Sequence, residues 1–318
     1  MRFGLALPNY ARWFDADGAR EIAVAAEQLG YHSIYVNDHV VIPGHEVSMF
    51  GNAYFDAFTT LGFLAAVTER VRLGTTVVVV PYRNPVVQAK MIASLDVYSK
   101  GRITFAVGVG HVPEESAALG VPYDVRGPMT DEYLKVMRTI WTDDEAGFHG
   151  RWVNFDHMHP LTRPVQQPLP VHYGGRGPRA LRRVVELCQG WQPMSLTPEQ
   201  ATEQIATLRG MATAAGRTDH IEVALRWPLH LVERSEDAPP IQHQGEIRRA
   251  RRAPAESAEL VARYAEAGVD ELIVDLPANR AVMSQQMEWI SPARLRRPAP
   301  RPVAEPGWSC PQTCGSRP

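Results

Sequence analysis

The chain has 318 residues, a hydrophobic content of 45% and a formal net charge of −2. This length suits one large globular domain, and the near-neutral charge argues against general binding to nucleic acid or anionic membranes. Three cysteines are too few for a disulfide framework. The N-terminal residues lack the apolar stretch of a signal peptide, and no apolar run is long enough to span a bilayer, so we expect a cytoplasmic protein.

Short apolar runs alternate with helical patterns along the whole sequence. The run 71–80 carries consecutive β-branched residues, as do parallel strands that are buried on both faces. Gly30 and Gly268 follow two of the helical stretches and are typical C-caps. The predicted strands are 3–7, 33–36, 71–80, 103–107, 169–173, 191–194, 221–227 and 271–276, and the predicted helices are 22–29, 53–68, 85–98, 114–119, 129–141, 178–188, a stretch that begins at 197–200, 254–267 and 279–289.

Eight strands interleaved with helices predict the α/β class and a closed (β/α)8 TIM barrel that occupies residues 1–290 as a single domain. Two polar or Pro-rich segments, 143–168 and 233–253, interrupt the alternation, and we expect them to be insertion loops at the C-terminal face. Residues 291–318 are rich in Pro and Arg, and we expect a disordered tail.

The glycine-rich segment after the fifth strand is the sharpest chemical signal. Gly174, Gly175 and Gly177 allow backbone N–H groups to approach an anion, and a helix follows at once, so its dipole favours phosphate. Arg176 and Arg179 add positive charge. The alternative is a tight turn beside a solvated basic face, and the residues alone leave both interpretations open.

Asp38 and His39 follow the second strand, and Glu115 follows the fourth. A histidine in this position can exchange a proton near neutral pH, although a structural loop histidine fits equally. Glu115 suits a general acid, or a charge that a helix N-terminus favours. We predict no metal site, because the nearest candidate, His157-Met158-His159, lacks a convergent set of carboxylates.

The chain resembles the luciferase-like monooxygenase superfamily, and most closely its bacterial coenzyme F420-dependent oxidoreductases. The blocks that carry the resemblance are 72–85, Gly108-Val109-Gly110, 118–122, and 164–168 followed by Gly174-Gly175. The resemblance implies a barrel, commonly a homodimer, with the ring of F420 or FMN in the barrel mouth and a non-prolyl cis peptide near Thr76-Val77. The cofactor-binding residues that we expect are Asp38, His39, Thr76, Val77, Gly108, Gly110, His111, Gly174, Gly175, Arg176, Gly177 and Arg179.

The expected activity is that of an F420H2-dependent reductase or the reverse dehydrogenase. Hydride would pass between the deazaflavin C5 and a C=C, C=N or C=O group of a small molecule, and His39 or Glu115 would deliver the proton. One alternative is an FMN-dependent monooxygenase that uses O2. Another is a non-catalytic barrel that only binds flavin.

Overall fold

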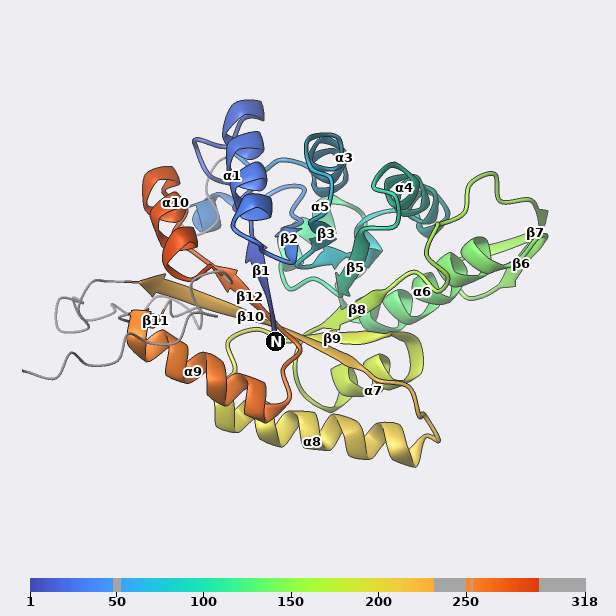
Figure 1. The fold of residues 1–318 in the computed structure, drawn as a ribbon. Coiled ribbons are helices and arrows are strands. Elements are labelled where there is room, and N and C mark those ends of the chain that lie inside the picture. Colours follow the sequence, from blue (N-terminus) through green and yellow to red (C-terminus); the bar gives the residue numbers. More distant parts are fainter. Residues whose placement is uncertain (48–52, 232–249, 253, 292–318) are drawn as a thin grey trace, which may run out of the picture.

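Parallel strands close into a barrel that helices surround (Figure 1). The computed structural model describes residues 1–47, 53–231, 250–252 and 254–291. Each strand pairs in parallel with its neighbour, and the pairing of the last barrel strand with the first closes the ring. The barrel strands are β1 (Arg2–Ala6), β2 (Ser33–Val36), β3 (Arg72–Thr75) with β4 (Val78–Val79), β5 (Ile103–Gly108), β8 (Val171–Gly174), β9 (Gly190–Gln192), β10 (Glu222–Leu231) and β12 (Glu271–Asp275).

The third predicted strand is divided in two. The run 71–80 forms β3, then β4, and ends in a 3-10 turn, η2 (Val80–Tyr82). The division falls at a cis peptide between Thr76 and Val77, which confirms the position that the resemblance implied. The other seven predicted strands are confirmed within a few residues of their expected bounds.

Helices return the chain from the carboxyl end of each strand to the amino end of the next. The helix predicted over 53–68 begins only at Ala57, because the side chain of Asp56 accepts a hydrogen bond from Thr59 N at 2.8 Å and caps it there. The helices are α1 (Ala16–Gln28), α3 (Ala57–Val67), α4 (Pro85–Tyr98), α5 (Pro113–Ala118), α6 (Arg126–Thr142), α7 (Pro178–Leu187), α8 (Pro198–Ala214), α9 (Pro254–Ala267) and α10 (Arg280–Trp289), with 3-10 turns η1 (Gly44–Glu46) and η3 (Tyr123–Val125).

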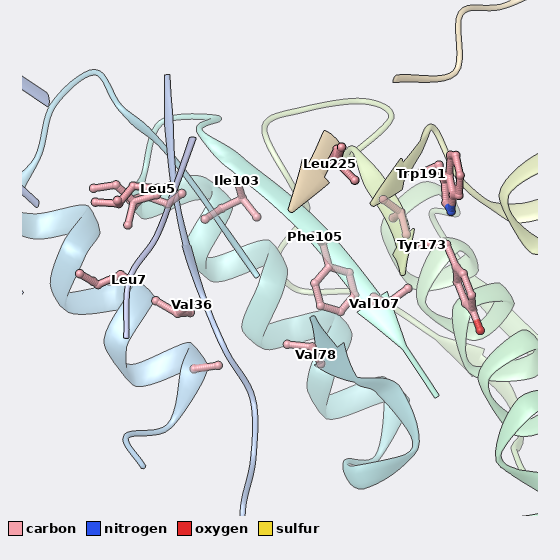
Figure 2. Packing of buried hydrophobic residues seen from close by; sticks show 14 of the residues in the cluster. Leu5, Leu7, Val36, Val78, Ile103, Phe105, Val107, Tyr173, Trp191 and Leu225 are labelled. Carbon is pink, nitrogen blue, oxygen red and sulfur yellow. The ribbon is translucent and has the colours of Figure 1, made fainter. Parts of the chain in front are cut away.

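Apolar residues cover the outer face of the barrel strands and also occupy part of the barrel interior. Side chains on the outer face of the strands, among them Leu5, Phe105 and Trp191, pack in one large cluster with the helices (Figure 2). A small inner cluster contains Ala6, Tyr35, Ala224 and Ile273. Burying one large apolar side chain contributes roughly 1.5–3 kcal/mol, so the outer layer holds the strand ends firmly in place.

The segment 143–168 contains an antiparallel hairpin of β6 (Ala146–His149) and β7 (Asn154–Met158), at the edge of the molecule in Figure 1. It connects the end of α6 to the start of β8. Gln166 accordingly contacts Asp96, near the end of α4, with Gln166 N donating to the carboxylate at 2.9 Å. The hairpin therefore lies at the amino ends of the strands, which corrects our expectation of an insertion at the C-terminal face.

The second predicted insertion, 233–253, follows the carboxyl end of β10. Its residues 250–252 form β11 (Ala250–Arg252), which pairs in parallel with residues 229–231 of β10. Residues 233–249 and 253, and residues 292–318 of the predicted tail, lie outside the described part of the chain. Among the helices that are described, none combines the length and the apolar character needed to cross a membrane.

Candidate active site

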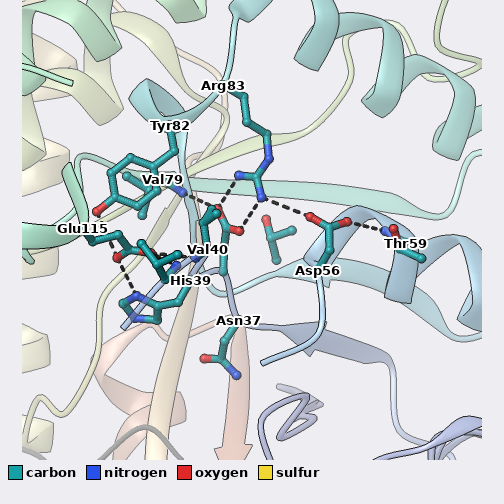
Figure 3. A network of polar contacts seen from close by, with 12 residues as sticks. Asn37, His39, Val40, Asp56, Thr59, Val79, Tyr82, Arg83 and Glu115 are labelled. Atoms are coloured by element: carbon teal, nitrogen blue, oxygen red, sulfur yellow. Dashed lines mark hydrogen bonds and ion pairs between the residues drawn. The ribbon is translucent and has the colours of Figure 1, made fainter. Parts of the chain in front are cut away.

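A histidine and a buried glutamate form the centre of a polar network at the mouth of the barrel, where the strands end (Figure 3). His39 follows β2, and Glu115 lies in α5, which follows β5. His39 Nδ1 is 2.8 Å from Glu115 Oε2. The structure thus brings together the two residues that the sequence proposed for proton transfer.

Glu115 is 1% exposed and accepts hydrogen bonds on both carboxylate oxygens. Val40 N donates to Oε1 at 2.6 Å, and the hydroxyl of Tyr82 donates to Oε2 at 3.1 Å. Burial by itself would raise the pKa of Glu115, but the hydrogen bonds from His39 and from the backbone outweigh it and lower that pKa. Glu115 is therefore ionised at neutral pH, which assigns the proton on Nδ1 to His39 as the donor.

Asp38 is held by an arginine from the next strand end. Both of its carboxylate oxygens accept hydrogen bonds from the guanidinium of Arg83 at 2.8 Å, and Val79 N donates to Oδ2 at 3.0 Å. Arg83 also contacts Asp56 at 3.2 Å. Asp38, which was predicted to bind the cofactor, therefore braces the strand end that presents His39.

Aromatic rings line the mouth beside His39. Tyr10 stacks on Tyr54 with ring centroids 5.4 Å apart, and Tyr54 meets His39 edge-on at 5.2 Å. His111 lies edge-on to His39 at 5.9 Å and is exposed. Although His111 as a whole is exposed, partial burial of its ring, and then its proximity to His39, lower the pKa of His111. The sequence analysis missed both tyrosines, because Tyr10 follows the first strand without a motif and Tyr54 lay inside a predicted helix.

Arg226 is a third residue of the site that was not predicted from the sequence. Its guanidinium extends from β10 to Asn37 Oδ1 at 2.8 Å and to the carbonyl oxygen of Thr76 at 3.0 Å. It also pairs with Asp275 at 2.9 Å. Burial alone would lower the pKa of Arg226, but Asp275, Tyr10 and Tyr54 together outweigh burial and raise it. One permanent positive charge thus joins β2, β3, β10 and β12 at the mouth.

Val77 packs on two glycines of the neighbouring strands. A Cβ atom on Gly108 would lie 2.8 Å from one Val77 methyl group, and a Cβ on Gly174 would lie 3.0 Å from the other. Thr76 N donates to the carbonyl of Val36 at 2.7 Å, and Thr76 is buried. Gly110 is similarly covered by Val79. Val77 is half-buried, so part of its side chain faces the mouth.

The glycine-rich turn lies at the same end of the barrel and is open. Gly175 and Gly177 have φ of +89° and +87°, and, apart from the chain neighbours of Gly177, no heavy atom of the described residues lies within 4 Å of a Cβ placed on it. Gly177 is the N-cap of α7, which begins at Pro178. Arg176 and Arg179 are exposed. An exposed glycine turn at a helix N-terminus is the kind of feature that an anion site requires.

The described residues fit a phosphorylated flavin or deazaflavin. The open turn suits a phosphate. Gln192, which is paired with Gly174 across the strands, is 3% exposed, yet neither its Nε2 nor its Oε1 has a hydrogen-bond partner in the described chain. Such a buried amide is costly unless a ligand or water satisfies it. A polar ligand in the mouth would supply that partner.

A parallel barrel with a hydrogen-bonded His39–Glu115 pair and an open glycine turn at its carboxyl face is the arrangement of a barrel enzyme. The chain belongs to the luciferase-like monooxygenase family, whose sequence profile matches residues 1–297. It is an oxidoreductase.

Two relatives and two solved structures illustrate the similarity. An uncharacterized protein of Mycobacterium tuberculosis is 29% identical over 88% of this chain and 94% of its own length. An F420-dependent glucose-6-phosphate dehydrogenase of Kineococcus radiotolerans is 27% identical over 83% of this chain and 78% of its own.

The first similar structure is an F420-dependent secondary alcohol dehydrogenase bound to an F420-acetone adduct. It has a TM-score of 0.78 and 20% identity, covering 92% of this chain and 98% of that one. The second is the monooxygenase RslO1 from Streptomyces bottropensis, with a TM-score of 0.76, 19% identity and the same coverage. At these identities the structures establish the barrel fold.

Proposed function

We propose that the protein is an F420-dependent reductase or dehydrogenase of a small molecule. The observation that carries this proposal is the His39–Glu115 pair at the same end of the barrel as the open turn at Gly174–Gly177. The relative of known activity from Kineococcus radiotolerans supports the choice of cofactor. The homodimer and the cytoplasmic location stay predictions from the sequence.

The bound deazaflavin would supply or accept a hydride at its C5 atom. His39 is the residue that exchanges the matching proton. Its Nδ1–H donates a hydrogen bond to Glu115, so the other ring nitrogen, Nε2, is the atom that gives or takes the proton. In the reducing direction, a C=O carbon gains the hydride and its oxygen takes the proton from His39. Glu115 accepts a hydrogen bond from either charge state of the ring and so fixes its orientation.

The remaining residues hold the cofactor. The N–H groups of the turn and the start of α7 would bind a phosphate, with Arg176 and Arg179 adding charge. Thr76, Val77, Gly108, Gly110 and His111 would border the ring. Asp38 and Arg226 would position the strand ends on which the ring rests.

Reconstitution with reduced F420 tests the proposal. We expect the purified protein to bind F420 and, with a suitable carbonyl substrate, to oxidise F420H2 without oxygen, as followed by the absorbance of the deazaflavin. Turnover that needs both reduced FMN and O2 would identify the monooxygenase alternative instead. Tight binding of flavin with no turnover of either cofactor would favour the non-catalytic barrel.

A further inference from the structure

Four aromatic side chains form a continuous row across the mouth of the barrel. The order is Tyr10, Tyr54, His39 and His111, with successive ring centroids 5.4, 5.2 and 5.9 Å apart. They come from three separate strand ends, after β1, β2 and β5. Tyr10, Tyr54 and His39 are half-buried and His111 is exposed, so the row is a surface that a ligand can contact. We call these four residues the aromatic wall.

Two arginines beside the wall are already paired with carboxylates. The guanidinium of Arg226 contacts Asp275 at 2.9 Å, and that of Arg83 contacts Asp38 and Asp56. An anionic ligand on the wall would therefore compete with carboxylates for these cations, and it would lose its hydration shell as well.

Two rings of the wall, those of Tyr54 and His111, are uncharged near neutral pH. Burial, and the nearby Tyr10, raise the pKa of Tyr54, so its phenol keeps its proton. The pKa of His111 is lowered, chiefly by burial, so its ring is neutral. Flat neutral rings offer dispersion and quadrupole contacts, which favour another planar ring.

We propose that the substrate is an uncharged carbonyl compound with a planar ring, such as an aryl ketone or its alcohol, that packs this ring against the aromatic wall. The proposal rests on the proposed function, since His39 must serve the carbonyl oxygen. In the reducing direction, the carbonyl carbon would gain the hydride that bound reduced deazaflavin supplies, the C=O π bond would break, and His39 would protonate the oxygen and regain its proton from solvent. The products are the secondary alcohol and the oxidised deazaflavin.

A matched pair of ketones tests the substrate class. Acetophenone and cyclohexyl methyl ketone carry the same carbonyl group and differ in whether the ring is planar and aromatic. We expect calorimetric titration of the F420-loaded protein to show acetophenone binding about three- to tenfold more tightly. Equal affinities would overturn the proposal, as would tighter binding of glucose 6-phosphate than of acetophenone.

Variants of Tyr54 locate the effect. Tyr54→Leu should abolish the preference for acetophenone, whereas Tyr54→Phe, which keeps the ring, should retain it. Tyr98→Leu is the matched control, because Tyr98 is 72% exposed at the end of α4, near the opposite face of the barrel. A preference that survives in Tyr54→Leu overturns the proposal. If Tyr54→Leu does not fold, loss of the preference in Tyr54→Phe overturns it as well.

The two proposals fail separately. Titration with F420 alone reports on the cofactor, and its failure would count against the proposed function. Repeating the ketone titration on cofactor-free protein then reports on the wall alone. The preference for the planar ketone, and its loss in Tyr54→Leu, should persist there.

Discussion

Asp38 and Arg83 are 45 positions apart in the sequence, yet two hydrogen bonds of 2.8 Å join them at the mouth of the barrel. The Asp38 side chain is completely buried, and Val79 N donates to it as well. This contact fixes the end of β2 against the end of β4. Because His39 directly follows Asp38, the ion pair sets the position from which the histidine reaches Glu115.

Replacing Arg83 should therefore destabilise the folded protein. Arg83→Met leaves a buried carboxylate without its counter-charge, and we expect the free energy of unfolding to fall by about 3–5 kcal/mol in urea denaturation. Arg182→Met is the control, since its pairs with Asp131 and Glu186 are half-exposed and each contributes about 1 kcal/mol or less. Similar losses in the two variants would contradict the structural role of the Asp38–Arg83 pair.

Replacing the proposed proton donor should affect turnover and leave cofactor binding intact. His39→Asn removes the group that exchanges the proton, so we expect kcat to fall by about 10²–10⁴-fold while the Kd of F420 changes little. Steady-state kinetics and a fluorescence titration measure the two quantities. His220→Asn, a solvent-exposed histidine paired with Asp270 beside the start of β10, should keep full activity. A normal kcat in His39→Asn would assign proton transfer to another group.

Much of the fold could be predicted because its signals are local. Runs of β-branched residues marked the strands, and glycine and proline marked helix ends, as at Gly30 and Pro178. The position of the β6–β7 hairpin could also have been predicted from the sequence. It follows a helix rather than a strand, and in a barrel such segments lie at the amino ends of the strands.

The rest of the site depends on contacts between distant segments. Arg226 lies within a predicted strand, and only the closed barrel shows that its guanidinium reaches Asn37 and Thr76. Tyr54 lay within a predicted helix, but in the structure Asp56 caps that helix, so Tyr54 lies in the loop before it. A single sequence carries no local signal for either contact.

The glycine turn can be tested by adding one methyl group. Gly177 has φ +87° and ψ 172°, a backbone conformation that is essentially restricted to glycine. Gly177→Ala should therefore displace the turn and weaken F420 binding by about 10-fold or more, the loss expected for one hydrogen bond to a charged group. The deazaflavin riboside without the phosphate should bind equally to the variant and the wild type.

Gly216→Ala is the matched control for this variant. Gly216 also has positive φ, at +73°, but it follows α8 near the amino ends of the strands. We expect no change in its affinity for F420. A parallel loss of binding of the phosphate-free deazaflavin in Gly177→Ala would show general damage rather than a lost phosphate contact.

A buried carboxyl group inside the barrel should give stability an unusual dependence on pH. Glu271 is 1% exposed; burial raises its pKa to about 7, from 4.5, even though Ser33 and Tyr35 donate hydrogen bonds to it. Between these pH values the folded chain binds a proton that the unfolded chain releases. Stability from this group is therefore greatest below pH 4.5 and declines as the pH rises to about 7, by about 3 kcal/mol in total.

Buried histidines act in the opposite direction, which determines how the measurement is made. Burial lowers the pKa of His172 to about 3 and that of His32 to about 4, so the unfolded chain binds protons that the folded chain does not, and stability rises with pH up to about 6.5. The dependence of the wild-type unfolding free energy on pH is thus a sum of opposing effects. The difference between wild type and Glu271→Gln isolates the carboxyl group, because the amide does not titrate. We expect the unfolding free energy of the wild type to fall relative to that of Glu271→Gln as the pH rises from 4.5 to 7. A constant difference would show that Glu271 is ionised throughout.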